Sequence, residues 1–217
     1  MQVVAGSKTY NQNCPLALGL DVIGERWTLL ILRELVGGSR RYSDLRAELP
    51  GIATNLLADR LRALEEAGLI YRTDMPTPIA RTVYQLSDAG WRKFTPVLQA
   101  IANFGMDQFD VNNAARTPLG GFLTGLLVGF DSSRAADIRA SYRVKVDGRT
   151  FDFSVDRGEL AAGRDPLAVT VEATATDLMT ARLAPTAARR KAAIRRIGFD
   201  GADDAVAELQ QAFQLSA

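Results

Sequence analysis

The stretch from Ser43 to Ser87 constrains the fold most, because an amphipathic helix is followed at once by two strand-forming runs. The apolar positions of this helix, at helical spacing, are Leu57, Leu61 and Leu64. Polar side chains occupy the other side, so the helix is expected to bury one face and leave the opposite face open. Thr54 is of a residue type that caps helix N-termini, and Gly68 can adopt the left-handed conformation that ends a helix.

The neighbouring segments complete a supersecondary pattern. Residues 69–72 and 82–86 are rich in strand-forming types, and the proline-containing segment 74–78 cannot lie in a central strand. A hairpin with an exposed tip is therefore predicted. Upstream, Ser43 is expected to cap a short helix. The resulting order is that of a winged helix-turn-helix, whose second helix can enter a DNA groove.

A dense apolar segment, 24–35, precedes this pattern and must be largely buried. Several separate blocks of the first half, in this order, resemble the HxlR-type, MarR-like winged-helix regulators of bacteria. The blocks are Cys14-Pro15, 21–32, 42–45, 57–68 and 84–87. Several blocks in the right order are far more specific than one motif.

The resemblance implies a homodimeric repressor or activator that binds double-stranded DNA. It also implies that the helix from Thr54 to Arg62 reads the major groove, while the hairpin contacts the backbone or the minor groove. The residues assigned to DNA are Arg40, Arg41, Ser43, Thr54, Asn55, Ala58, Asp59, Arg62, Arg72 and Arg81. Asn55 stands where the family often has a basic residue. Asparagine can pair with adenine or be an ordinary solvated helix residue, and both interpretations stay open.

Bulk charge alone does not favour nucleic acid. Up to Gln108 the chain has 12 basic and 11 acidic residues, and the remainder has 14 of each. Attraction to phosphates then depends on local clustering, so DNA binding requires several arginines to share a surface. The alternative is solvated faces with exposed ion pairs. The arginines concerned are Arg40, Arg41, Arg46, Arg60, Arg62, Arg72 and Arg81.

The composition argues against an enzyme, a metal site and a bound cofactor. The chain has no histidine, one cysteine, and no glycine-rich phosphate loop after a strand. Its longest apolar run, 119–130, is broken by glycines and is too short to cross a bilayer. No basic-then-apolar leader opens the sequence, so we expect a cytoplasmic protein with no membrane partner.

The single cysteine, Cys14, is a candidate redox site. Some proteins of the resembled family use a cysteine near this place as a thiol sensor. Pro15 suggests a helix that begins just after Cys14, and a helix N-terminus lowers the pKa of a thiol. The alternative is an inert, partly buried thiol.

A long apolar-rich helix, 88–109, comes next. The resemblance implies that it forms the dimer interface with the N-terminal helix; packing on the second domain is the alternative. A dimer predicts an inverted-repeat operator, with the two recognition helices about 34 Å apart. The polar segment 112–118 ends in proline, so we place a DNA-binding and dimerisation domain at 1–111 and a second domain at 117–217.

The second domain alternates apolar and polar residues at 139–146 and 150–155, on either side of the turn Asp147-Gly148. Further strands are predicted at 159–162 and 168–173, and helices at 119–127, 132–138, 176–183, 186–194 and 203–215. The fold class is therefore α+β: a winged helix-turn-helix followed by an antiparallel sheet with helices on one face.

Four strings of the second domain, 142–148, 153–158, 165–171 and 197–201, resemble the sterol-carrier-protein-type lipid-binding family. Members of that family enclose an apolar tunnel, which implies a hydrophobic small-molecule effector. The candidate lining residues are Phe122, Leu126, Phe130, Tyr142, Phe153 and Met179. Ordinary core packing is the alternative for each of them.

The function predicted from these patterns is a homodimeric, DNA-binding transcriptional regulator whose second domain binds that effector. One alternative is a thiol- or oxidant-sensing regulator acting through Cys14. Another is a lipid-binding carrier whose winged helix mediates protein contacts. The basic run 189–196 can serve DNA phosphates, an acidic ligand or the other domain, or form a solvated helix face, and is assigned no site.

Overall fold

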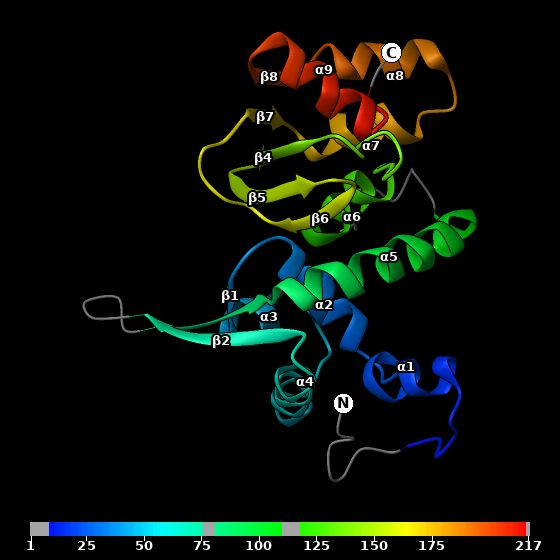
Figure 1. The fold of residues 1–217 in the computed structure, drawn as a ribbon, viewed down its shortest axis with the longest axis vertical. Helices are drawn as coiled ribbons and strands as arrows, with labels where there is room; N and C mark the ends of the chain where they lie inside the picture. The colour runs from blue at the N-terminus through cyan, green and yellow to red at the C-terminus, as the bar shows by residue number, and fades with distance from the viewer. Residues whose placement is uncertain (1–8, 76–80, 110–117, 216–217) are drawn as a thin grey trace. The chain divides into compact units, whose positions relative to one another are not determined.

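The computed structural model describes residues 9–75, 81–109 and 118–215 of the 217-residue chain. The side chains of residues 119 and 122–124 also lie outside the description. The chain divides into two compact units, Met1–Trp91 and Arg92–Ala217, each drawn in Figure 1. The predicted boundary between residues 111 and 117 falls largely on residues that are not described, so it stays a prediction.

The first unit is a winged helix-turn-helix, as predicted. Its helices are α1 (Pro15–Ile23), α2 (Thr28–Val36), α3 (Tyr42–Glu48) and α4 (Thr54–Glu66). Its strands, β1 (Arg40–Arg41), β2 (Ile70–Met75) and β3 (Arg81–Leu86), form an antiparallel sheet in the order β1-β3-β2. The most deeply buried side chains of this unit include Ile31, Leu32, Leu35, Leu45, Leu57, Leu61 and Leu64.

Two helices start earlier than predicted, α3 by two positions and α4 by one. Ser43 does not cap α3; Arg41 is the N-cap, and its backbone N–H donates to the Asp44 carboxylate over 3.1 Å. An acidic side chain three residues into the helix satisfies that N–H, which moves the start upstream. Thr54 is likewise the first helical residue rather than the cap. Gly68, with φ +70°, follows the end of α4 as expected.

The second unit holds most of α5 (Asp88–Gly105) and a short 3₁₀ turn, η1 (Met106–Gln108). Its other helices are α6 (Leu119–Val128), α7 (Ala175–Leu183), α8 (Ala187–Ile194) and α9 (Asp203–Ala212). Its strands are β4 (Arg139–Val146), β5 (Arg149–Asp156), β6 (Glu159–Ala162), β7 (Val169–Ala173) and β8 (Gly198–Gly201), in the sheet order β6-β5-β4-β7-β8.

Two predictions for this unit are wrong. The sheet is mixed rather than antiparallel, because β7 crosses to the far side of β4 and pairs with it in parallel, Tyr142 opposite Val169. Residues 132–138 form turns rather than a helix. The Asp131 carboxylate accepts hydrogen bonds from the backbone N–H groups of Ser133 and Arg134, a turn that competes with helix formation.

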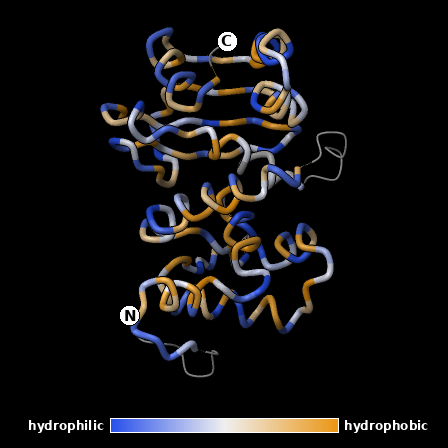
Figure 2. Tube along the Cα trace, turned by 90° about the vertical axis from the view of Figure 1, so that its right-hand side faces the viewer, coloured by the Kyte–Doolittle hydropathy of each residue, from blue (hydrophilic) through white to orange (hydrophobic). Residues whose placement is uncertain are grey.

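An aromatic cluster lies in the interior of the second unit. The Phe213 ring lies 5.1 Å from the Phe130 ring and 5.3 Å from the Phe153 ring, measured between centroids. Tyr142 lies 5.5 Å from Phe153 and is fully buried. In Figure 2, hydrophobic residues recur along the strands and helices of each unit between hydrophilic ones, as this packing requires.

The Tyr142 hydroxyl is buried and has no hydrogen-bond partner among the described residues. Burial, with a smaller contribution from Glu208, raises the pKa of Tyr142 to about 12. The folded chain therefore holds this proton more tightly than the unfolded chain, so stability is lost as the pH rises from about 10 to 12.

We predict that Tyr142→Phe leaves the free energy of unfolding unchanged near neutral pH or raises it by up to about 1 kcal/mol. Between pH 10 and 12 the free energy of unfolding of the wild type should fall by about 2–3 kcal/mol through this group, and the variant should not show this fall. Urea unfolding across this range measures both. Parallel pH curves for the two proteins would contradict the burial of this hydroxyl.

Candidate nucleic-acid interface

The outer face of α4 is open, as the leucine spacing predicted. Leu57, Leu61 and Leu64 are at most 2% exposed and hold the helix on one side. The predicted contact residues on the other side are exposed, apart from half-buried Ala58; they are Thr54, Asn55, Asp59 and Arg62. The described first unit thus presents a polar helix face of the kind that can enter a groove.

The ion pair on this face is exposed and weak. The Arg62 guanidinium lies 3.1 Å from the Asp59 carboxylate, and both side chains are more than half exposed. An exposed pair of this kind contributes about 0–1 kcal/mol, so Arg62 can exchange Asp59 for a phosphate or a base at little cost. The carbonyl oxygen of the Asn55 side chain accepts from the backbone N–H of Leu56, which leaves its NH₂ group to donate outward.

Three contacts fix α4 in the unit, and sequence reasoning found none of them. The Tyr42 hydroxyl donates to the Thr54 carbonyl over 2.5 Å. Arg60 donates to the Glu25 carboxylate over 2.7 Å, and the Trp27 ring lies against Gly51 in the turn before α4. Arg60 therefore does not join the outward-facing arginines. Its place beside Leu61 at the flank of the apolar stripe was the signal in the sequence.

The strand register places the arginines of the wing on two opposite faces. Arg40 and Arg72 both pair with Tyr84, so they share its face of the sheet. Arg41 pairs with Val83 and therefore shares the other face with Arg81, which stands two residues from Val83 along β3.

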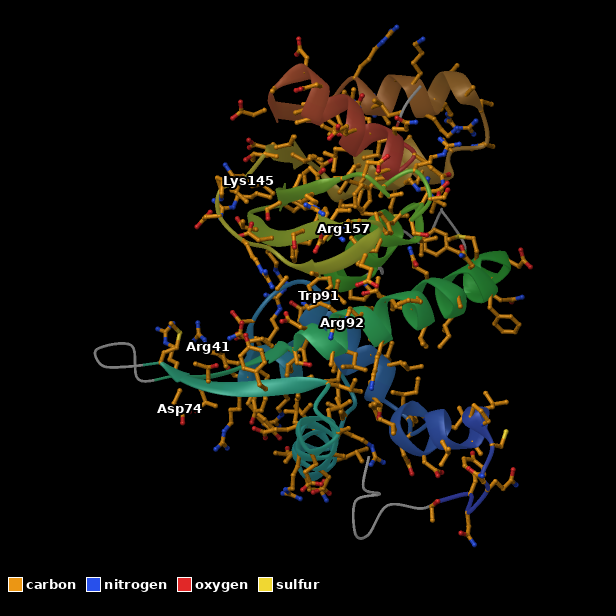
Figure 3. All side chains as sticks on the ribbon, in the orientation of Figure 1. Arg41, Asp74, Trp91, Arg92, Lys145 and Arg157 are labelled. Atoms are coloured by element: carbon orange, nitrogen blue, oxygen red, sulfur yellow. The ribbon has the colours of Figure 1, made fainter. Side chains whose placement is uncertain are left out.

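Asp74 lies on the face of Arg72, and Figure 3 shows Arg41 and Asp74 on opposite sides of this sheet. The predicted wing contacts, Arg72 and Arg81, are both exposed but are not brought together.

The remaining predicted DNA contacts lie at the start of α3. Ser43 is exposed, and its hydroxyl lies 3.5 Å from the Asp44 carboxylate. The Arg41 side chain lies 3.7 Å from the same carboxylate. Asp44 thus offsets part of the positive charge next to the wing. Among the described residues, no group of histidine, cysteine and acidic side chains gathers as a metal site would require.

Cys14 is the N-cap residue of α1, followed by Pro15 at the first helical position. The backbone N–H groups of Ala17 and Leu16 lower the pKa of the Cys14 thiol. The thiol is half-buried and forms no disulfide. Its position agrees with the helix start that Pro15 predicted.

In the second unit, the predicted ligand-lining residues separate into two groups. Tyr142, Phe153 and Leu126 are buried, and Phe130 packs on Phe213 in the aromatic cluster. The side chain of Phe122 lies outside the described residues. Met179 instead lines a surface groove of about 280 Å³ between α7 and α8. The other residues of the groove are Thr176, Thr180, Leu183, Ala184, Pro185 and Arg189.

The family match covers most of the first unit and the beginning of the second. The model of the HxlR-like helix-turn-helix family matches residues 22–113. The uncharacterized HTH-type transcriptional regulator sll1512 of Synechocystis is 40% identical over 94 residues, which are 43% of this chain and 69% of that protein. YvaP of Bacillus subtilis, described in the same words, is 32% identical over 101 residues, 46% of this chain and 93% of that protein.

One solved structure among the similar ones is the reduced form of the transcriptional regulator YodB from Bacillus subtilis. It is 28% identical, covers 46% of this chain and 98% of its own, and superposes with a TM-score of 0.37.

Proposed function

The chain belongs to the HxlR-like helix-turn-helix family of transcriptional regulators, and on this premise we propose that it binds an inverted-repeat operator as a homodimer and responds to a hydrophobic effector. The observation that carries the proposal is the exposed polar face of α4, opposite its buried leucine stripe. The protein would then work in the cytoplasm, with double-stranded DNA, a second copy and the effector as its partners. None of the described helices is long and apolar enough to span a membrane.

In this proposal the outer face of α4 reads base edges in the major groove. Thr54, Asn55, Ala58, Asp59 and Arg62 supply that face. The wing and the start of α3 bind the sugar-phosphate backbone or the minor groove, and the residues assigned there are Arg40, Arg41, Ser43, Arg72 and Arg81. Because Arg72 and Arg81 face opposite ways, a hairpin laid flat on DNA presents one of them, and an edge-on hairpin presents both.

Exposed apolar side chains support the homodimer. On α1, Leu16 is 70% exposed, and Leu18 and Leu20 are also exposed. In the second unit, Ile101 and Phe104 of α5 are exposed. Apolar surface of this kind is costly in water and is commonly covered by another protein surface. We propose that a second copy of this chain covers these apolar side chains.

The groove beside Met179 supports the proposal that the second unit binds an effector. Its volume of about 280 Å³ is just below the range of about 300–1,000 Å³ that ligand pockets span, and Leu183 and Pro185 make its walls largely apolar. An effector that prefers one arrangement of the recognition helices changes DNA affinity by that same preference, typically about 1–3 kcal/mol.

Binding to DNA tests the main proposal. The probe is the duplex upstream of the chain's own gene, called here the upstream duplex, and its base-shuffled counterpart. We expect two chains per upstream duplex, and we expect Arg62→Ala to weaken binding about tenfold or more in fluorescence anisotropy at fixed salt. Arg139→Ala, which removes an exposed arginine of the second unit outside the basic run 189–196, is the control. No binding at low salt would leave the lipid-carrier alternative.

Dye binding tests the groove. The neutral dye N-phenyl-1-naphthylamine should fluoresce on the wild-type chain, and Met179→Arg should weaken its binding about tenfold because the new side chain fills and charges the groove. Ala188→Arg, exposed on α8, is the matched control. Equal dye binding by Met179→Arg and wild type would remove the groove as the effector site.

Oxidant sensing through Cys14 is the second candidate function, and the lowered pKa of its thiol at the start of α1 favours it. Because Cys14 is the single cysteine, oxidation can join it only to another molecule, such as the second copy. Cys14→Ser should then abolish the effect of diamide on operator binding and leave the binding of the dye to the groove unchanged. An equal diamide effect on both proteins would contradict thiol sensing.

A further inference from the structure

Arg60 is the one charged side chain of α4 that turns inward. The other charged residues of the helix, Asp59, Arg62, Glu65 and Glu66, are exposed. The Arg60 side chain is 21% exposed and donates to the Glu25 carboxylate over 2.7 Å, across 35 positions of sequence. This contact joins α4 to the short connection between α1 and α2.

A helix held by a single stripe of leucines can roll about its own axis, because apolar contacts are not directional. An α-helix with its side chains is about 10–12 Å across, so a roll of about 20° moves a side-chain tip by about 2 Å. Hydrogen bonds to base edges tolerate only a few tenths of an ångström. The bond from Arg60, at the flank of the stripe, opposes such a roll.

The connection that carries Glu25 is itself held in place. At Gly24 a Cβ atom would lie 2.6 Å from the Leu20 carbonyl oxygen, so only glycine fits there. Trp27 adopts a left-handed conformation, φ +79°, which a bulky residue keeps only when its surroundings impose it. Its ring lies against Gly51, and the Arg26 guanidinium lies 5.5 Å from the ring centroid. The backbone that carries Glu25 is thus fixed, and it holds the Glu25 carboxylate beside Arg60.

We propose that Glu25 is a positioning residue for DNA reading: its bond to Arg60 sets the rotation of α4 and links that rotation to α1. Glu25 stands two residues after α1 ends at Ile23, and α1 carries the exposed leucines. A shift of α1 therefore reaches the recognition helix through this ion pair, in addition to the contact of the Trp27 ring with Gly51. The part that concerns DNA rests on the proposed function; the part that concerns the rotation of α4 does not.

Glu25→Gln tests the proposal. We expect the ratio of affinities for the upstream duplex and its shuffled counterpart to fall about tenfold. Binding to the shuffled duplex should be unchanged or tighter, because the substitution removes a negative charge from the protein. Glu65→Gln removes an exposed acid from α4 itself and should keep the ratio. The reversed pair, Glu25→Arg with Arg60→Glu, should restore part of it, which a general loss of stability would not allow.

Backbone amide NMR shifts give a readout without DNA. In Glu25→Gln, the amides of the outer face of α4, such as Asn55 and Asp59, should shift, and in Glu65→Gln only those next to the substitution. An unchanged ratio together with unchanged α4 shifts in Glu25→Gln would overturn the proposal. If the wild type does not distinguish the two duplexes, the proposed function fails, and the amide shifts alone decide whether Glu25 sets the rotation of α4.

Discussion

The one-sided packing of α4 is the constraint on which the first unit depends. Each buried leucine of the stripe contributes about 1.5–3 kcal/mol, so Leu57, Leu61 and Leu64 leave the helix no alternative face to bury. The opposite face is forced into solvent, and the residues placed there cost the fold little. The surface proposed to read DNA is therefore a consequence of how the core is made, and polar contacts such as the bond from Arg60 add the precision that leucines cannot.

The two units offer different kinds of surface for binding. The first keeps an exposed face whose main ion pair, Asp59 with Arg62, is weak enough to be exchanged. The second packs aromatic rings around Phe213, and the space proposed for an effector is the groove beside Met179.

Local patterns in the sequence predicted where the helices and strands lie. They did not predict which other segments these elements contact. Helical spacing found α4, and Asp147-Gly148 marked the turn between β4 and β5. The direction of β7 depends on the path of the connection before it, which carries no periodic signal, so the parallel pairing with β4 was missed. Arg60 was counted among outward arginines because its acid stands 35 positions earlier. Family resemblance supplied the DNA contacts, and the strand register alone revealed that Arg72 and Arg81 face opposite ways.

Hydrogen–deuterium exchange with and without the upstream duplex measures the central claim most directly. If α4 reads DNA, the amides of residues 54–62 and of the wing strands should exchange more slowly in the complex, while those of β4 and β5 in the second unit keep their rates. Slower exchange confined to the second unit, with α4 and the wing unchanged at saturating duplex, would contradict the account.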